Sequence, residues 1–270
     1  MHMPHSLLIL LVVLLAAGGT LSCTAQQKNP LSSLPADIRQ PVQNALNAVR
    51  MDEKERDRII AAITANPGGF ATLYKEVRAS MSADPDLLRR VDKSTALASD
   101  FVPADLVPLD GPFPYIVSKK GMQLRKPARD ALVRMAESAR KDGITLIVSS
   151  AYRSYAYQSK VYAENAAEMG EAEAARVSAL PGHSQHQLGT AIDFGTINDG
   201  FAETAQGRWL ASNAGRFGFS LSYPQGMEQI TGYKWESWHY RYIGVSAVEI
   251  QNAFFLGIQQ YLIEFLAALK

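Results

Sequence analysis

The most informative shortages in this chain of 270 residues are those of cysteine and histidine. Cys23 is the only cysteine, so no disulfide can form within the chain and no thiolate cluster is available to a metal ion. Two of the five histidines lie within the first five residues, which leaves His183, His186 and His239 for the rest of the protein. Any chemistry that requires an imidazole must therefore use these three side chains.

An excess of charge and a long hydrophobic run are also absent. The 27 basic and 26 acidic residues nearly cancel, so no overall field draws the chain to a polyanion, and we expect no nucleic-acid partner. The apolar run at 7–17 is shorter than the about 20 residues that a membrane-spanning helix needs. Its length and position are typical of the hydrophobic part of a secretory signal peptide, so residues 1–22 are predicted to be a signal peptide.

The single cysteine directly follows this run, in the context GTLSC, which resembles the lipobox of bacterial lipoproteins. We therefore expect Cys23 to be lipidated and to anchor the chain in a membrane of the cell envelope. The alternative is a cysteine of the leader without such a role. Residues 23–34 are rich in Gln, Asn, Ser and Pro, a composition that suits a tether between the membrane and a folded domain.

The rest of the chain has ordinary globular composition, with 47% hydrophobic and 20% charged residues, and enough length for a sizeable core. Segments 37–49, 52–65 and 71–81 have mixed apolar and charged faces typical of helices. The breakers Asn-Pro-Gly-Gly at 66–69 separate the last two. Residues 35–99 are therefore predicted to form a helical region that packs on the domain C-terminal to it.

Residues 100–246 combine helical and strand patterns, which predicts an α+β domain. The clearest helix is at 126–142, with Pro127 in its first turn and Gly143 as its stop. The β-branched run after this helix predicts a buried strand ending near Ser150. The other predicted elements are helices over 155–169 and 209–217 and strands over 190–195 and 233–243.

The last segment, 247–270, is apolar on most faces but is interrupted by polar residues. These are Glu249, Gln251, Gln259, Gln260 and Glu264. We predict an amphipathic helix that packs on the domain, and a membrane-surface or partner-binding helix is the alternative.

Two short segments, SQHQLGTAIDF at 184–194 and WESWHYR at 235–241, carry a set of residues that suits metal chemistry. Catalytic zinc commonly takes two histidines and one carboxylate and keeps a fourth position for water. His186, Asp193 and His239 match this set, although such ligands alone do not exclude other divalent ions. Each residue taken singly suits a structural role as well, and their joint occurrence favours a metal site.

Glu236 precedes His239 by three residues and can supply a general base beside the metal. A spacing of three in a flat strand places two side chains on opposite faces. We therefore expect a bulge or a turn between Glu236 and His239.

The strings SAYRSYAYQ, LPGHSQHQLGTAIDF and ESWHYRYIG resemble, in this order and spacing, the M15 D-alanyl-D-alanine carboxypeptidases related to VanY. That group also contains D-Ala-D-Ala dipeptidases and the zinc-binding domain of hedgehog proteins. The resemblance covers roughly residues 106–244. It implies a compact α+β fold with a central antiparallel sheet.

For the site, the resemblance implies zinc on His186, Asp193 and His239, with Glu236 as the catalytic base. It also implies that Arg153 stabilises charge on the substrate or the transition state, which suits a guanidinium held after a strand. Ser184 and Gln158 are weaker candidates for substrate hydrogen bonds. His183 lies next to the ligand loop but outside the ligand pattern.

The implied function is that of an exported zinc D,D-carboxypeptidase, which hydrolyses the terminal D-Ala-D-Ala bond of peptidoglycan stem peptides. An endopeptidase acting inside such peptides is the alternative on the same metal core. A non-catalytic zinc-stabilised binding module is a third possibility, disfavoured because structural zinc needs neither Glu236 nor Arg153.

Overall fold

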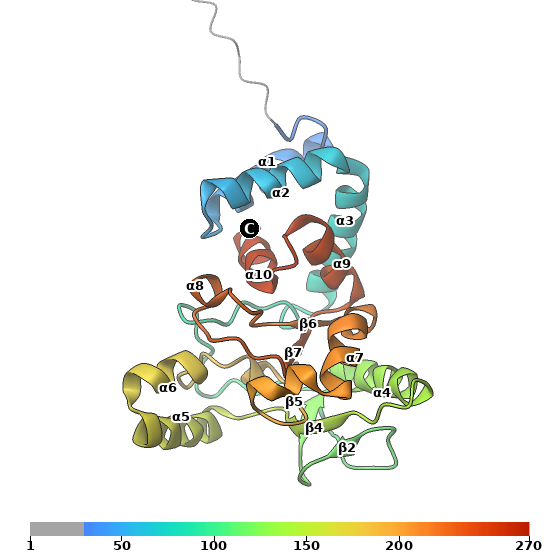
Figure 1. The fold of residues 1–270 in the computed structure, drawn as a ribbon. Helices are drawn as coiled ribbons and strands as arrows, with labels where there is room; N and C mark the ends of the chain where they lie inside the picture. The colour runs from blue at the N-terminus through green and yellow to red at the C-terminus, as the bar shows by residue number, and fades with distance from the viewer. Residues whose placement is uncertain (1–29, 270) are drawn as a thin grey trace, which may run out of the picture.

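The computed structural model describes residues 30–269, so the predicted signal peptide and Cys23 lie outside the described residues. Two layers are stacked in it (Figure 1). The helical layer consists of α1 (Ala36–Ala48), α2 (Glu53–Ala65), α3 (Pro67–Ala83), α9 (Val245–Phe254) and α10 (Gln259–Ala268). The sheet layer contains the strands and the helices that cover them. Within residues 30–269, no helix is long and apolar enough to cross a membrane.

The helices of the N-terminal region begin where the sequence provides caps. Asp52 caps α2, since its Oδ1 accepts the N–H of Glu55 at 2.7 Å and the Glu55 side chain returns to the Asp52 N–H in a capping box. Asn66 caps α3 by accepting the N–H of Gly69 at 3.0 Å. Of the four expected breakers at 66–69, only Asn66 lies outside a helix. Pro67 suits the first position of α3, and the two glycines complete its first turn.

The C-terminal segment differs from the prediction of a single helix, because α9 and α10 are separated at 255–258. Leu256 adopts φ 58° and Gly257 adopts φ 72°, a left-handed conformation that no α-helix can continue through. Helix α10 packs against α1, so the two ends of the described chain share one core. In that core the ring of Phe70 meets Phe254 edge-on with centroids 5.2 Å apart and also contacts Phe265.

The main sheet has five strands in the order β2 (Ile116–Val117), β4 (Ile147–Ser150), β5 (Ala191–Phe194), β7 (His239–Tyr242) and β6 (Phe219–Leu221). Only the β2–β4 pair is parallel, so the centre of the sheet is antiparallel as expected. The strand predicted over 233–243 is shorter in the structure, because residues 233–238 form a loop and only β7 pairs. Strand β4 is less buried than predicted, with Ile147 37% exposed.

The sheet is covered by α4 (Lys126–Lys141), α7 (Ala205–Asn213) and the short helix η3 (Ala214–Phe217), which share a second core. Helix α4 ends as predicted before Gly143, which has φ 76°. Helix α7 begins four residues earlier than expected, because Thr204 accepts the N–H of Gly207 and caps it. The remaining elements are the hairpin of β1 (Leu106–Pro108) and β3 (Gln123–Arg125), with α5 (Tyr155–Met169), α6 (Glu171–Val177), η1 (Gln185–Leu188), η2 (Asp199–Glu203) and α8 (Glu228–Thr231).

Candidate active site

Two neighbouring strands and one tight turn bring the predicted ligands together. Asp193 of β5 stands opposite His239 of β7 in the antiparallel register, which places the two side chains within reach of each other. His186 comes from η1, which ends at Gly189. Gly189 has φ 67°, and a Cβ there would lie 2.9 Å from Leu106 Cδ2, so this turn back into β5 requires glycine.

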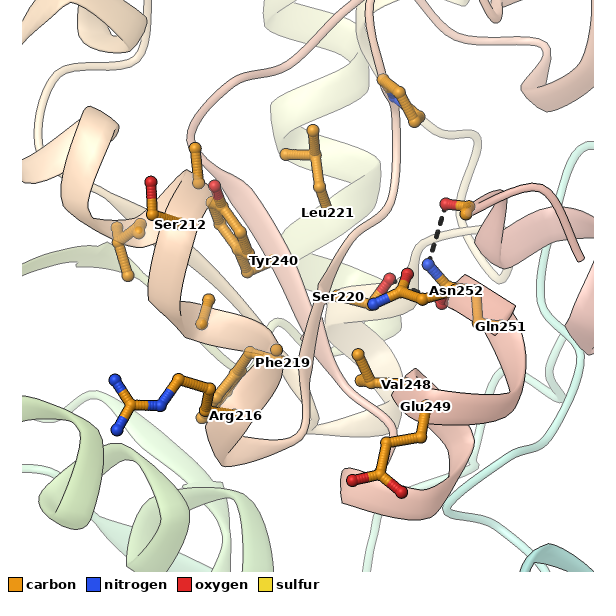
Figure 2. A pocket seen from close by; sticks show the side chains of 16 residues that line it. Ser212, Arg216, Phe219, Ser220, Leu221, Tyr240, Val248, Glu249, Gln251 and Asn252 are labelled. Carbon is orange, nitrogen blue, oxygen red and sulfur yellow. Dashed lines mark hydrogen bonds between the residues drawn. The ribbon is translucent and has the colours of Figure 1, made fainter. Parts of the chain in front are cut away.

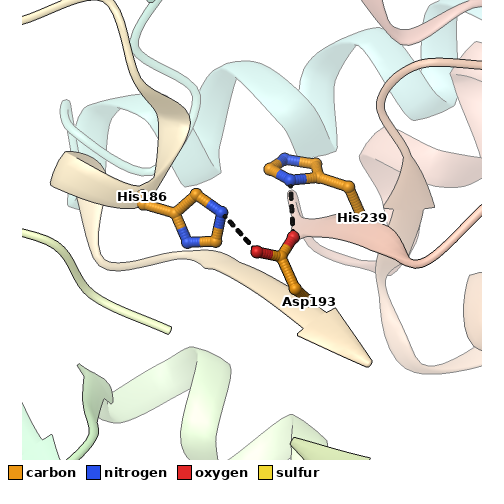
Figure 3. A group of neighbouring side chains, drawn as sticks. All are labelled: His186, Asp193 and His239. Carbon is orange, nitrogen blue, oxygen red and sulfur yellow. Dashed lines mark hydrogen bonds and ion pairs between the residues drawn. The ribbon is translucent and has the colours of Figure 1, made fainter. Parts of the chain in front are cut away.

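The three side chains form a compact buried group (Figure 3). Asp193 lies between the two imidazoles, with Oδ2 3.2 Å from His186 Nε2 and Oδ1 2.9 Å from His239 Nδ1. The exposed fractions of His186, Asp193 and His239 are 1%, 6% and 3%. One ligand atom from each residue lies within 4.8 Å of the other two, so a single ion can reach all three.

Each imidazole directs a different ring nitrogen at Asp193. His186 Nδ1 lies 2.6 Å from the carbonyl oxygen of Ala151, which can only accept, so this nitrogen donates and Nε2 keeps its lone pair. His239 Nε2 lies 3.1 Å from Gln185 Oε1, so its Nδ1 faces the group. A hydrogen bond from the distal ring nitrogen is the arrangement that orients histidine as a metal ligand.

The group fits a zinc ion. Ligand atoms at 2.0–2.1 Å from zinc and at tetrahedral angles are about 3.3 Å apart, close to the separations from Asp193 to the two imidazoles. His186 Nε2 is buried and has no hydrogen-bond partner within residues 30–269. Burial lowers the pKa of His186 to about 4 and leaves its imidazole neutral. Burial alone would raise the pKa of Asp193, but its contacts with the two imidazoles hold it well below its usual range, so its carboxylate is ionised at neutral pH and can serve as a ligand.

Glu236 lies beside the ligand group and outside it. The N–H of His239 donates to the carbonyl oxygen of Glu236 at 3.3 Å, which confirms the expected turn between them. The turn brings Glu236 Oε2 to 3.6 Å from His239 Nδ1. Burial raises the pKa of the Glu236 carboxyl well above its usual range, and the nearby Asp193 carboxylate adds to the effect. The carboxyl is thus placed to exchange protons beside the site.

Arg153 reaches the same site from the loop after β4. Its backbone N–H donates to the carbonyl oxygen of His186 at 3.2 Å, and its Nη2 lies 3.9 Å from Asp193 Oδ2. Ser184 lines the cleft and accepts the N–H of His186 with its hydroxyl at 3.3 Å. Both residues therefore lie where the sequence predicts them, next to the ligands.

Gln158 is not placed as predicted. Its Nε2 donates to the carbonyl oxygen of Ala179 at 2.7 Å and lies 3.4 Å from Ser178 Oγ. The amide therefore holds the loop that walls the cleft and does not itself face the cleft. His183 also turns away, with Nδ1 2.7 Å from the carbonyl oxygen of Asp92.

The ligands open into a cleft of about 180 Å³. Its walls include the aromatic side chains of Tyr223, Tyr233 and Trp238, which the sequence alone does not single out because aromatic residues are also common in cores. The ring of Tyr223 packs on that of His239 with centroids 4.8 Å apart. The sequence does not single out Gln185 either, because a lone glutamine gives no pattern that distinguishes it.

A larger pocket of about 490 Å³ lies between α7, β6 and α9 (Figure 2). Arg216 and Glu249 line it, with Ser220 and Gln251 among its polar residues. It contains none of the ligands, nor Glu236 or Arg153, so the smaller cleft is the candidate active site.

Comparison with known proteins assigns the region that contains the three candidate ligands to one protein family. Residues 121–245 match the family model described as VanY: D-alanyl-D-alanine carboxypeptidase. YodJ of Bacillus subtilis (strain 168), whose name describes a carboxypeptidase, is 36% identical over 182 residues, which is 65% of this chain and 67% of that protein.

Two solved structures extend the likeness to the fold. The LdcB LD-carboxypeptidase is 34% identical, with a TM-score of 0.60 over 69% of this chain and 89% of that one. A mutant of the vancomycin-resistance D,D-pentapeptidase VanY in complex with Zn(II) is 31% identical, with a TM-score of 0.54 over 67% of this chain and 99% of that one.

Proposed function

This chain belongs to the VanY family of D-alanyl-D-alanine carboxypeptidases, and from that premise we propose that it is a zinc-dependent D,D-carboxypeptidase that removes the terminal D-alanine of peptidoglycan stem peptides. The observation that carries the proposal is the buried group of His186, Asp193 and His239 at a cleft that also holds Glu236 and Arg153. A purely structural zinc site needs neither Glu236 nor Arg153, so their presence favours catalysis over a binding module.

The chain's own residues divide the reaction between them. When bound, zinc supplies a Lewis acid that brings the pKa of water to about 7 and polarises the scissile carbonyl. Glu236 takes a proton from the attacking water and delivers it to the leaving amine, so the proton count balances as the amide bond breaks. Arg153 stabilises the negative charge that develops on the carbonyl oxygen.

Unpaired polar atoms in the cleft support peptide binding there. The Nε of Arg153 and the hydroxyl of Tyr233 are buried and have no hydrogen-bond partner within the described part of the chain. Both residues line the cleft, so a substrate carboxylate or carbonyl can pair with them. The small volume of the cleft suits a terminal residue with a methyl side chain.

A second candidate activity is favoured by the likeness to LdcB, a protein named as an LD-carboxypeptidase. In that case the enzyme would cleave between an L-residue and a terminal D-alanine. Two peptides distinguish the D,D activity from the L,D activity. Full-length purified protein is incubated with a pentapeptide ending in D-Ala-D-Ala and with the tetrapeptide ending in one D-Ala.

We expect zinc-dependent D-alanine release from the pentapeptide and its loss with a chelator. Release from the tetrapeptide alone would replace the D,D assignment with the L,D one. Cleavage only inside a cross-linked peptide would show an endopeptidase, and zinc binding without any cleavage would show a binding module.

For location, the apolar run at 7–17 and the lipobox-like context of Cys23 support export and a lipid anchor at the cell envelope, where stem peptides occur. The test is fractionation of cells that produce the unaltered protein or Cys23→Ala. The variant is expected to leave the membrane fraction while its purified form keeps its activity, because Cys23 is separated in sequence from every ligand. Equal membrane association of both proteins would contradict the anchor.

A further inference from the structure

The two imidazoles of the site are held by different kinds of acceptor. His186 donates to a backbone carbonyl oxygen, that of Ala151, which can act only as an acceptor. His239 instead faces the side-chain amide of Gln185, at 3.1 Å from Oε1. An amide presents an oxygen or an NH2 group depending on which way it is turned, so the ring of His239 is fixed only if the amide of Gln185 is fixed.

The orientation of that amide is set by a chain of hydrogen bonds that begins in the helical layer. Gln259, the first residue of α10, donates from Nε2 to the carbonyl oxygen of Ser220 at 3.3 Å. Because that carbonyl only accepts, the Oε1 of Gln259 must turn the other way, toward Gln185. Gln185 then donates from Nε2 to this oxygen at 3.3 Å and presents its own Oε1 to His239.

A hydroxyl strengthens the same arrangement. Ser222 Oγ lies 2.7 Å from Gln185 Oε1 and 3.3 Å from Gln259 Oε1, so its single hydroxyl proton can be donated to either oxygen, with the shorter contact to Gln185. Ser222, Gln185 and Gln259 are all buried, so water does not replace a lost partner. If the amide of Gln185 were reversed, its NH2 group would oppose the Nε2–H of His239, and the proton would have to move to Nδ1, the nitrogen that faces Asp193.

We propose that Gln259 is a positioning residue that acts through Gln185 to hold the ring of His239 with Nδ1 toward the metal. The inference rests on the proposed function to the extent that His239 is a zinc ligand. It assigns the C-terminal helix, which lies outside the region matched by the family, a part in building the metal site.

The start of α10 is itself held firmly. Gln251 of α9 donates from Nε2 to the carbonyl oxygen of Gly257 at 2.9 Å, across the turn between the two helices. Ser220 donates its hydroxyl to Gln251 Oε1 at 2.8 Å. Ser220 therefore contacts Gln251, which binds the turn, through its side chain and Gln259 through its backbone.

The test compares two adjacent buried glutamines of α10 in the full-length protein. Gln259→Leu removes the donor to Ser220 and the acceptor for Gln185. Gln260→Leu is the matched control, since the Gln260 amide binds Asp92 and Glu264 and makes no contact with the chain of bonds described above. Zinc affinity is measured by competition with a chelator, and long-range ¹H–¹⁵N spectra of the zinc-loaded protein report which nitrogen of His239 carries the proton.

For Gln259→Leu we expect zinc affinity to fall by about 10- to 100-fold, the range typical of losing a partner that orients a ligand. The Nε2–H signal of His239 should be lost or should exchange faster with solvent. Gln260→Leu should keep both the affinity and the signal. Unchanged affinity in Gln259→Leu, or an equal loss in the two variants, would overturn the proposal.

A pair at Gln185 keeps the test decisive if Gln259→Leu does not fold. Gln185→Glu retains an oxygen for the Nε2–H of His239 and should retain most of the zinc affinity, whereas Gln185→Leu should not. Equal affinities in this pair would contradict the role of Gln185. Zinc binding by the unaltered protein without peptide cleavage would refute the proposed function and leave this inference standing, whereas no zinc binding would overturn both.

Discussion

The core of the sheet layer and the core of the helical layer differ in the parts of the chain that build them. The sheet core takes its buried residues from Leu109 to Tyr240, one continuous stretch. The helical core joins residues 31–88 to residues 243–269, from the two ends of the described chain. The family match, at 121–245, covers most of the first and almost none of the second. All three predicted ligands lie within the continuous stretch that builds the sheet core. The helical layer beside them is built from both ends of the described chain.

Strand β7 connects the two layers. Residues two apart in a strand share a face, so His239 and Arg241 point to the same side of the sheet. His239 belongs to the metal group, whereas Arg241 Nη2 donates to the carbonyl oxygens of Leu87 and Arg89 at 3.0 and 2.8 Å. Burial lowers the pKa of Arg241 to about 10, so it remains charged at neutral pH. One short strand thus fixes the site to the segment that leads out of α3.

The largest effect is expected from the ligands of the sheet layer. His186→Ala, Asp193→Ala and His239→Ala should each remove most of the bound zinc and reduce D-alanine release to background, because two protein ligands hold zinc poorly. Metal analysis of the purified variants measures the bound zinc, and a peptide assay measures the release of D-alanine.

His183→Ala is the matched control for these variants. His183 is close in sequence to His186, but its ring meets the backbone of Asp92. We expect it to keep its zinc and its activity. Near-stoichiometric zinc in any of the three ligand variants would remove that residue from the ligand set, and loss of zinc in His183→Ala would show that the segment around Asp92 governs the site.

Glu236→Gln is expected to separate metal binding from turnover. The variant should keep zinc and its melting temperature but lower kcat by roughly 10²- to 10⁴-fold, the usual contribution of acid–base catalysis. Glu228→Gln, which removes a partly exposed carboxylate that pairs with Arg176, serves as the control and should keep its rate. Loss of zinc in Glu236→Gln would make Glu236 a ligand, and full activity would remove it from the mechanism.

What the sequence predicts well is what depends on neighbouring residues. The ligand set and the turn from Glu236 to His239 follow from spacing within short motifs, because the strand period fixes where side chains point. Gly189 is similarly local, since its turn needs a positive φ.

What the sequence does not reveal depends on distant contacts. The break between α9 and α10 includes Leu256 at φ 58°, a conformation that a leucine rarely adopts and that no local rule favours. The Gln158 amide turns to Ala179 and Ser178, twenty or more residues away, and Gln185 meets Gln259 across 74 residues. Amide side chains choose partners by tertiary position, so their roles appear only in the structure.

A pair of identical substitutions tests whether the two cores unfold together. Leu46 of the helical core and Leu132 of the sheet core are both fully buried. Leu46→Ala and Leu132→Ala should each lower the free energy of unfolding by about 2–5 kcal/mol, the cost of the lost burial and the cavity. Because polar contacts such as those of Arg241 join the layers, we expect a single denaturant transition in both variants. Two separate transitions, with Leu46→Ala shifting only one of them, would show that the layers unfold independently.

The smallest effect is expected at the edge of the helical layer. Asp52→Ala removes the cap of α2 and should lower the free energy of unfolding by about 0.5–2 kcal/mol, since the N–H of Glu55 loses its acceptor. Asp57→Ala, an exposed position on the same helix, is the control and should change stability by no more than about 0.5 kcal/mol. Chemical denaturation gives both values, and kcat measured well below the transition should be unchanged in both variants, because α2 contributes no residue to the cleft. A fall in kcat for Asp52→Ala alone would mean that loss of the α2 cap alters the metal site. It would contradict the view that the helical layer affects stability and the sheet layer affects catalysis.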